Sequence, residues 1–363
     1  MAAEPHAIPV APPPAARRHE ELVVRRGARS GLFTIVAVHS TALGPSLGGC
    51  RMWHYPTTTD AADDALRLSR AMTLKAAAAG LSLGGGKGVI CLPAAAPAPE
   101  GSVRRDVLLD FADTVDALDG AYITAEDVGT SARDMVTIAE RTRHVTGLPT
   151  VHGGSGDPSA FTAQGVEAAM RACCAAAFGT PELGARSVAI VGCGHVGERL
   201  ARRLAAAGAR VVLADVDEGK RSLAAELPRA AWAEPAEALG ADVDVLAPCA
   251  LGGVLDERTV PRVGARVICG AANNQLADDG LAADLAARGV VYAPDFVANA
   301  GGVINVAAEL EPGGYDPERT RVRVAQIEDL MAAILAEAEA DGTTPLAAAV
   351  RRARRRLDAA PRR

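Results

Sequence analysis

Lysine is nearly absent from this chain. Only Lys75, Lys87 and Lys220 carry it among the 38 basic residues of the 363-residue sequence, so arginine supplies almost every other cation. Arginine keeps its charge permanently, whereas burial can drive a lysine neutral and let it act as a base. Two of these lysines share one apolar, glycine-punctuated segment, residues 72–90. The pair is therefore a candidate for function, with a helix-end cation and a loop cation as the plainer alternative.

Other scarcities exclude broad classes of protein. Aromatic residues make up only 3% of the chain, which argues against an aromatic-rich β-sandwich. No apolar run approaches the roughly 18 residues that a membrane-spanning helix needs. The net charge of −6 argues against nucleic acid as the main partner. We therefore expect no nucleic-acid partner and no membrane partner.

The cysteines and the first residues indicate the compartment. The seven cysteines include no CxxC motif, which predicts reduced thiols in a cytoplasmic protein. No cluster of histidine, cysteine and carboxylate has metal-ligand spacing, so we expect no metal. Residues 1–16 contain five prolines and lack the charged and apolar regions of a signal peptide. They are predicted to form a disordered leader.

The length predicts two domains, because 363 residues exceed the size at which one core usually keeps growing. In the first half, two β-rich runs, residues 21–26 and 32–39, flank a hairpin signal. Residues 43–52 are interpreted as a glycine-containing loop that approaches a ligand or simply turns. A helix is predicted from the Thr57–Asp60 caps to about residue 79, with Lys75 on its apolar stripe.

The glycines before Lys87 are predicted to leave space for a small substrate. These are Gly84, Gly85 and Gly86, followed by a short strand at residues 88–92. A further strand, residues 121–124, leads into Asp127. A carboxylate at the carboxyl end of a strand is typical of α/β active sites, although helix N-caps occupy the same place.

A dinucleotide-binding fingerprint lies in the second half. A buried strand, residues 187–191, runs into a GxGxxG turn and a helix, and a second strand, residues 211–214, ends at Asp215. This context predicts a pyrophosphate at the helix N-terminus and a carboxylate on the ribose hydroxyls. Asp215 would repel a 2′-phosphate, so NAD is predicted rather than NADP. The turn comprises Gly192, Cys193, Gly194, His195, Val196 and Gly197.

Further αβ units follow, with small or polar loops after each strand. Asn273, Asn274 and Asn299 in these loops could bond a carboxamide or ribose, or could be routine loop residues. A helix is predicted from the Asp316 cap to about residue 340, and a last helix at residues 345–357. The arginine run at residues 351–356 favours a solvated or subunit-facing surface over nucleic-acid binding.

Several motifs together resemble the leucine, valine and phenylalanine dehydrogenases of the glutamate dehydrogenase superfamily, in unbroken order over about residues 20–357. The motifs are Leu43-Gly-Pro-Ser-Leu-Gly-Gly-Cys-Arg-Met52, Met72-Thr-Leu-Lys75, Gly84-Gly-Gly-Lys87, Glu126-Asp-Val-Gly-Thr130, Ala247-Pro-Cys-Ala-Leu-Gly252, Gly270-Ala-Ala-Asn-Asn274 and Asn299-Ala-Gly-Gly-Val-Ile304.

The resemblance implies a two-domain α/β fold. Residues 17–147, together with about 335–363, would form an N-terminal α/β substrate and oligomerisation domain. Residues 148–334 would form a Rossmann-like NAD-binding domain, with a C-terminal helical return. The implied activity is the reversible, NAD-dependent oxidative deamination of an L-amino acid to a 2-oxo acid and ammonia, in a homo-oligomer.

The resemblance also implies roles for individual residues. Lys75 would bind the substrate carboxylate, Lys87 would be the base for water, and Asp127 would handle the amino-group proton. The substrate would also be bound by Leu47, Gly48, Gly49, Met72, Thr146, Val303 and Val306. Beside the GxGxxG turn and Asp215, the cofactor would be bound by Thr162, Ala250 and Asn274.

Alternatives remain open at this point. The pocket context favours an aliphatic, leucine- or valine-type substrate, but Phe161 and residues 294–299 also look like those of phenylalanine enzymes. A catalytically silent NAD-binding protein is a second possibility, against which the intact Lys75, Lys87 and Asp127 argue. A 2-hydroxy acid dehydrogenase would need an arginine anchor and a histidine base, and no such pair is evident.

Overall fold

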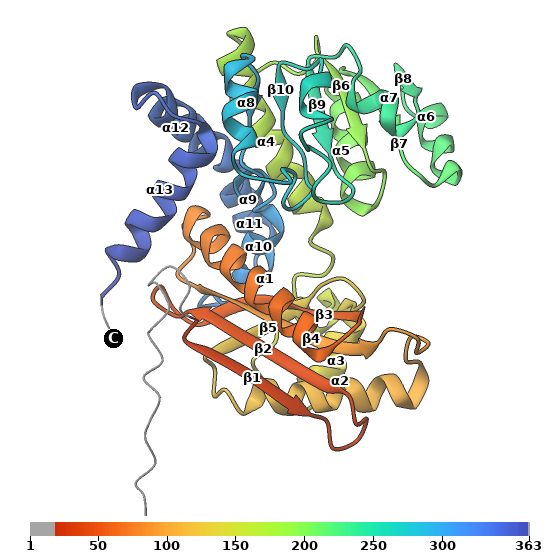
Figure 1. The fold of residues 1–363 in the computed structure, drawn as a ribbon, viewed down its shortest axis with the longest axis vertical. Coiled ribbons are helices and arrows are strands. Elements are labelled where there is room, and N and C mark those ends of the chain that lie inside the picture. The colour runs from red at the N-terminus through yellow and green to blue at the C-terminus, as the bar shows by residue number, and fades with distance from the viewer. Residues whose placement is uncertain (1–18, 362–363) are drawn as a thin grey trace, which may run out of the picture.

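The computed structural model describes residues 19–361. The predicted leader, residues 1–16, lies outside the described residues. The chain folds into two lobes, each built on its own sheet, with the strands of the first lobe below and those of the second above in Figure 1. Within residues 19–361, no helix combines the length and apolar character needed to cross a bilayer.

The first lobe contains a mixed five-stranded sheet in the order β1-β2-β4-β3-β5. β2 pairs antiparallel with β1 and β4, while β3 runs parallel to β4 and β5. The antiparallel β1–β2 pair confirms the predicted hairpin. The strands are β1 (Glu21–Arg26), β2 (Phe33–Ser40), β3 (Ser46–Tyr55), β4 (Gly84–Pro93) and β5 (Tyr122–Glu126).

The prediction of a loop at residues 43–52 was wrong, because most of that segment forms β3. The glycines allow close packing within the sheet. A Cβ placed on Gly48 would lie 1.8 Å from the carbonyl oxygen of Gly86, and one on Gly49 would lie 2.6 Å from that of Glu126.

The prediction for residues 84–86 was also wrong. These glycines belong to β4, and protein atoms fill the space beside them. A Cβ on Gly85 would lie 2.1 Å from the Thr73 nitrogen, and one on Gly86 would lie 2.6 Å from the Tyr122 ring. The glycines therefore let a helix and an aromatic ring pack against the strand.

Helices cover both faces of the first sheet. α1 (Thr58–Ala78) lies on one face, and α2 (Gly101–Asp116) and α3 (Ala132–Ala139) lie on the other. Alternation along β2 explains the layers: Ile35 belongs to the core with Ala61 of α1, and Val36 to the core with Phe111 of α2. Capping boxes at Thr57 and Ser131 begin α1 and α3.

The second lobe contains a six-stranded sheet in the order β11-β10-β9-β6-β7-β8, with every neighbouring pair parallel. Counted from the fingerprint strand β6, the first of these strands along the chain, the order is 6-5-4-1-2-3. This is the doubly wound dinucleotide-binding order, and its switch point lies between β6 and β9. The strands are β6 (Ser187–Val191), β7 (Arg210–Ala214), β8 (Ala230–Trp232), β9 (Val245–Pro248), β10 (Val267–Ile268) and β11 (Val291–Tyr292).

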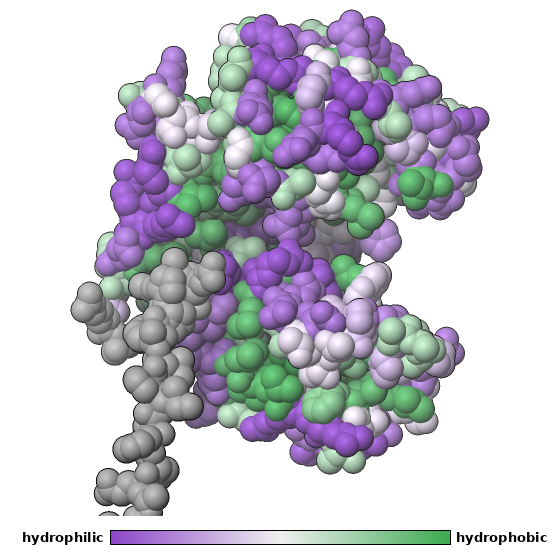
Figure 2. Space-filling model, viewed as in Figure 1, coloured by the Kyte–Doolittle hydropathy of each residue, from purple (hydrophilic) through white to green (hydrophobic). Residues whose placement is uncertain are grey.

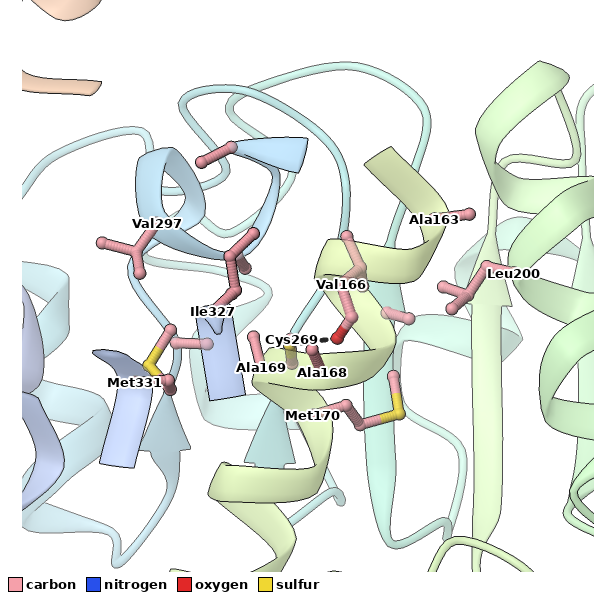
Figure 3. Packing of buried hydrophobic residues seen from close by; sticks show 14 of the residues in the cluster. Ala163, Val166, Ala168, Ala169, Met170, Leu200, Cys269, Val297, Ile327 and Met331 are labelled. Atoms are coloured by element: carbon pink, nitrogen blue, oxygen red, sulfur yellow. Dashed lines mark hydrogen bonds between the residues drawn. The ribbon is translucent and has the colours of Figure 1, made fainter. Parts of the chain in front are cut away.

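A central helix, α4 (Ser159–Phe178), organises the core of this lobe. Figure 3 shows its buried residues, such as Val166 and Met170, between Leu200 of α5 (His195–Ala206) on one side and Ile327 and Met331 of α12 (Ile327–Ala340) on the other. The shorter helices are η2 (Thr150–His152), η3 (Glu218–Arg221), α6 (Ser222–Glu226), α7 (Pro235–Leu239), η4 (Val260–Arg262), α8 (Leu281–Ala287), α9 (Asp295–Ala298), α10 (Gly301–Ala307) and η5 (Ala308–Leu310).

The predicted helix from Pro317 to about residue 340 is two helices. A single residue, Gln326, separates α11 (Pro317–Ala325) from α12, and the Asp316 cap of α11 is confirmed. The last helix, α13 (Pro345–Asp358), returns to the first lobe and lies beside α1 in Figure 1. Its Arg356 donates to the carbonyl oxygen of Ala77 at 3.1 Å, near the end of α1.

Candidate active site

A cavity of about 190 Å³ lies between the two lobes. An opening between the upper and lower lobes is visible on the right of Figure 2. Both conspicuous lysines reach the cavity, Lys75 from α1 and Lys87 from β4, and Asp127 reaches it from the end of β5. The other lining residues are Leu47, Gly48, Gly49, Arg51, Leu68, Ala71, Met72, Ala125, Glu126, Pro158, Asn273, Asn274, Asp295, Phe296, Gly302, Val303 and Val306.

Lys87 and Asp127 form a short ion pair. Lys87 is only 4% exposed, and its Nζ donates to Asp127 Oδ2 at 2.6 Å. Arg51 Nε donates to the same oxygen at 3.1 Å. Burial favours the neutral acid, but the Lys87 and Arg51 charges outweigh it and hold the pKa of Asp127 at about 2. Asp127 is therefore a carboxylate at neutral pH.

The Thr130 hydroxyl fixes the main chain of Asp127. The Asp127 N–H donates to Thr130 Oγ1 at 3.0 Å, and that hydroxyl donates to the Cys50 carbonyl of β3 at 2.8 Å.

The neighbouring Glu126 differs from Asp127 in its pKa. Burial, with a contribution from Asp157, raises the pKa of Glu126 to about 7. Two adjacent carboxyl groups thus differ in charge near neutral pH.

Lys75 joins the two lobes. It is half-buried near the end of α1, and its Nζ donates to Asn273 Oδ1 at 3.0 Å. Asn299 Nδ2 donates to the same oxygen at 2.9 Å. Burial lowers the pKa of Lys75 to about 8, with Asp295 opposing the shift and Lys87 adding to it. An ammonium in this state is a ready partner for an incoming carboxylate.

Asp295 fixes the loop that carries Asn273 and Asn274, here called the asparagine loop. Its carboxylate is buried and accepts from the Gln275 N–H at 3.1 Å and from the Phe296 N–H at 2.7 Å. Burial raises the pKa of Asp295, and Lys75 opposes the rise. Asn274 itself adopts a left-handed backbone with φ of 51°.

Sequence reasoning missed Arg51, Glu126 and Asp295 as site residues. Arg51 and Glu126 stand inside motifs that carry the family resemblance, and Asp295 follows a strand as Asp127 does. Two of the residues predicted to support the substrate or nicotinamide, Thr146 and Thr162, lie off the cavity lining. Thr146 is buried with its hydroxyl donating to the Thr124 carbonyl at 3.2 Å, and the Thr162 hydroxyl donates to the Pro158 carbonyl at 3.0 Å.

The predicted cofactor turn has three distinct glycines. Gly192 has φ of 106°, and a Cβ on Gly197 would lie 1.9 Å from the Gly192 carbonyl oxygen, so α5 packs closely on the turn. A Cβ on Gly194 meets nothing within 4 Å. Gly194 begins α5 without a side-chain cap, leaving main-chain N–H groups for an anion. His195 and Val196 open the helix behind it.

The surroundings of this turn fit a dinucleotide. Ala250, after β9, lies against Gly192 at the switch point. Asp215 Oδ2 accepts from the Cys193 N–H at 2.6 Å, which fixes the carboxylate beside the turn. Val216 is 92% exposed and Leu251 is 79% exposed, after β7 and β9 respectively. Both residues follow strands that pair with β6, so they lie at the same edge of the sheet as the turn. No metal-binding group of three or more histidine, cysteine or carboxylate side chains is found in residues 19–361.

Comparison with known proteins matches two family models. The glutamate/leucine/phenylalanine/valine dehydrogenase dimerisation domain matches residues 19–144, and the glutamate/leucine/phenylalanine/valine dehydrogenase model matches residues 213–362. Valine dehydrogenase of Streptomyces albus is 46% identical over 342 residues, which are 93% of this chain and 92% of that protein. Leucine dehydrogenase of Bacillus cereus is 43% identical over 343 residues, which are 93% of this chain and 91% of that protein.

A solved structure agrees with these matches. L-tryptophan dehydrogenase from Nostoc punctiforme superposes with a TM-score of 0.80 at 36% identity, covering 95% of this chain and 97% of that one. The chain therefore belongs to the glutamate/leucine/phenylalanine/valine dehydrogenase family, and it is an amino acid dehydrogenase.

Proposed function

We propose that the protein catalyses the reversible, NAD-dependent oxidative deamination of an aliphatic L-amino acid, of the valine or leucine type, to the 2-oxo acid and ammonia. The observation that carries this proposal is the cavity shared by Lys75 and the Lys87–Asp127 pair, which the asparagine loop of the second lobe closes. The relatives named valine and leucine dehydrogenase support the aliphatic choice.

Each charged residue then has a chemical task. Lys75 binds the substrate carboxylate as an ammonium, and its present partner, Asn273 Oδ1, marks where an acceptor oxygen fits. Asp127, ionised at neutral pH, takes a proton from the substrate amino group. Lys87 in its neutral form removes a proton from the water that attacks the imine carbon. When bound, NAD supplies the acceptor for the hydride from the α-carbon.

The remaining wall selects the side chain. Leu47, Met72, Val303 and Val306 present apolar groups to the cavity. One methylene changes binding by only about 1–3 kcal/mol, so valine, leucine and isoleucine should all react. Thr146 is proposed to support the substrate, and Thr162 and Asn274 to support the nicotinamide.

The domain assignment and assembly are part of the proposal. Residues 17–147 with about 335–363 form the substrate and oligomerisation unit, and residues 148–334 bind the cofactor. We propose a homo-oligomer that uses the edge strand β1, where Leu22 and Val24 are 42% and 45% exposed. A hydrophobic patch is visible on the lower lobe in Figure 2. We also propose a cytoplasmic location, which the seven free cysteines support.

A substrate panel tests the proposal. Purified protein with NAD and single L-amino acids should produce the absorbance of reduced cofactor, with valine or leucine above phenylalanine. Faster turnover of phenylalanine would favour the aromatic alternative. Cofactor binding with no turnover of any amino acid would identify a silent NAD-binding protein and end the proposal.

The choice of NAD is tested at Asp215. In Asp215→Ser/Val216→Arg, a guanidinium replaces a carboxylate that would repel a 2′-phosphate. The ratio of kcat/KM for NADP over NAD should rise by about 100-fold, since a charge reversal at this range contributes about 2–3 kcal/mol. An unchanged ratio would remove Asp215 from the ribose site.

A further inference from the structure

One oxygen atom in the site serves two cations. Asp127 Oδ2 accepts from Lys87 Nζ at 2.6 Å and from Arg51 Nε at 3.1 Å, so the two charges lie within about 6 Å of each other. Arg51 is tied down at its other end, where Nη1 donates to Asp64 Oδ2 on α1 at 2.9 Å. Arg51 thus spans from α1 to the carboxylate.

Asp64 is itself fully engaged. Tyr55 donates its hydroxyl hydrogen to Asp64 Oδ2 at 2.7 Å, and Arg67 donates to Oδ1 at 2.6 Å. These bonds fix Asp64 and, through it, the Arg51 side chain. The arrangement leaves Arg51 little freedom to leave Asp127 when the neighbouring lysine changes its charge.

In the proposed reaction, Lys87 must be neutral when it takes a proton from water. While Lys87 is neutral, it gives Asp127 no positive charge. An unpaired carboxylate in a partly buried site would itself tend to take up a proton. Arginine cannot lose its charge under these conditions. Arg51, bonded to the same oxygen, therefore supplies Asp127 with a permanent positive charge whether or not Lys87 is protonated.

We infer that Arg51 is a positioning residue for the reaction, which holds Asp127 ionised and oriented while Lys87 alternates between its charged and neutral forms. Arg51 also places a permanent like charge within about 6 Å of Lys87 Nζ. The inference rests on the proposed function.

The other titratable groups around the pair come from several elements. They are Lys75 and Asp64 on α1, Cys50 on β3, Glu126 and Tyr122 on β5, and Asp295 on α9. Within residues 19–361, only Lys87 and Arg51 form ion pairs with Asp127. Removing Arg51 therefore leaves Lys87 as its single cationic partner in the described chain.

The test is the pH dependence of kcat/KM for amino acid oxidation at saturating NAD. In Arg51→Gln the acid limb, on which activity rises as the base loses its proton, should move up by about one pH unit. Activity on the limb should fall about tenfold and recover at higher pH. Equal loss at every pH, with the limb unmoved, would mean a purely structural role and overturn the inference.

Matched variants separate charge from packing. Arg51→Lys keeps a cation and should return the limb to within about half a pH unit of wild type. Asp64→Asn removes the carboxylate that shares the Arg51 charge, so its limb should move to lower pH, opposite to Arg51→Gln. Arg70→Gln removes an exposed cation of α1 that forms no hydrogen bond or ion pair with Asp64, Arg51 or Asp127 in the described residues, and it should leave the limb unchanged.

Two further controls keep the outcome clear. If Arg51→Gln does not fold, the downward shift in Asp64→Asn carries the test, and its absence overturns the inference. Because Glu126 has a pKa of about 7, the Arg51→Gln shift is measured again in a Glu126→Gln background. Wild-type protein that turns over no amino acid fails the proposed function instead, before any variant is compared.

Discussion

At the scale of single residues, the chemistry depends on which side chain carries charge at working pH. Asp127, with a pKa of about 2, is ionised, and Lys75, with a pKa of about 8, remains largely an ammonium at pH 7. The proposed roles of the two lysines follow from their positions: Lys75 contacts Asn273 of the second lobe, while the buried Lys87 contacts the Asp127 carboxylate.

Replacement of Lys87 by alanine tests its role as the base. The Lys87→Ala enzyme should lose about 10²- to 10⁴-fold in kcat, the usual range for a general base. NAD binding, measured by fluorescence titration, should stay near wild type because the turn at Gly192–Gly197 lies in the other lobe. Normal turnover in this variant would remove Lys87 from the mechanism. Lys220→Ala, on η3, is the control for loss of a lysine as such.

Glu126 should make the stability of the fold depend on pH. Burial raises its pKa from 4.5 to about 7, so the folded state holds this proton more tightly than the unfolded state does. Its stabilising contribution is full below pH 4.5 and is lost as the pH rises through 7. Glu126→Gln keeps an uncharged group, so its melting temperature relative to wild type should increase from pH 5 to pH 8. A constant difference would contradict this, and Glu182→Gln, at an exposed position, is the control.

The sequence allowed Lys75, Lys87 and Asp127 to be predicted as one site because each is a rare type or stands in a telling place. Arg51, Glu126 and Asp295 were not predicted. In a chain with 35 arginines, one more arginine carries no signal. Glu126 and Asp295 acquire their meaning only through burial and through partners distant in sequence, which a linear pattern does not reveal.

At the scale of elements, the turn between β6 and α5 can be probed with two glycines three positions apart. Gly194→Ala points its methyl group into open space, so folding should be intact while the Kd for NAD rises at least tenfold, because the pyrophosphate needs that space. Gly197→Ala would place a methyl group 1.9 Å from the Gly192 carbonyl oxygen and should destabilise the second lobe. Thermal melts and NAD titrations check the pair. Equal effects of both changes on stability would contradict the assignment.

Element prediction succeeded where local signals were strong and failed where glycine was misread. The hairpin was predicted from its β-rich runs and turn signal, α1 from its capping residues, and the fingerprint unit from its glycine-containing turn. β3 was predicted as a loop because Gly48 and Gly49 are poor strand formers in isolation. Close approach of three backbones overrides that preference, and the approach is a property of the sheet rather than of the segment. The break between α11 and α12 likewise has no proline or glycine to announce it.

At the scale of the whole molecule, the Lys75–Asn273 hydrogen bond couples the lobes. A bond to a charged group contributes about 1.5–3 kcal/mol, so Asn273→Ala should shift the substrate-free protein toward more open arrangements by at least tenfold. Small-angle scattering and hydrogen exchange at residues 147–156 should report the change. Asn273→Asp should act oppositely, by pairing with Lys75, and should raise the KM for the amino acid. Indistinguishable Ala and Asp variants would contradict the coupling.

The two-domain α/β organisation could be predicted, because length, the fingerprint and the ordered motifs all indicate it. The contacts across the lobes could not. Asn273 stands 198 positions from Lys75, and Arg356 meets Ala77 279 positions away. Only the folded chain brings such pairs together.

The main-chain wall of the pocket sets limits on engineering. A Cβ would lie 1.8 Å from a carbonyl oxygen at Gly48, 2.6 Å from one at Gly49, and 2.6 Å from the Thr162 hydroxyl at Gly302. A mutational library aimed at new substrates therefore has no usable positions along that wall. Diversity has to come from α1 and α10, through Leu68, Met72, Val303 and Val306. Variants of this enzyme can therefore change the substrate they accept while these three glycines stay unaltered.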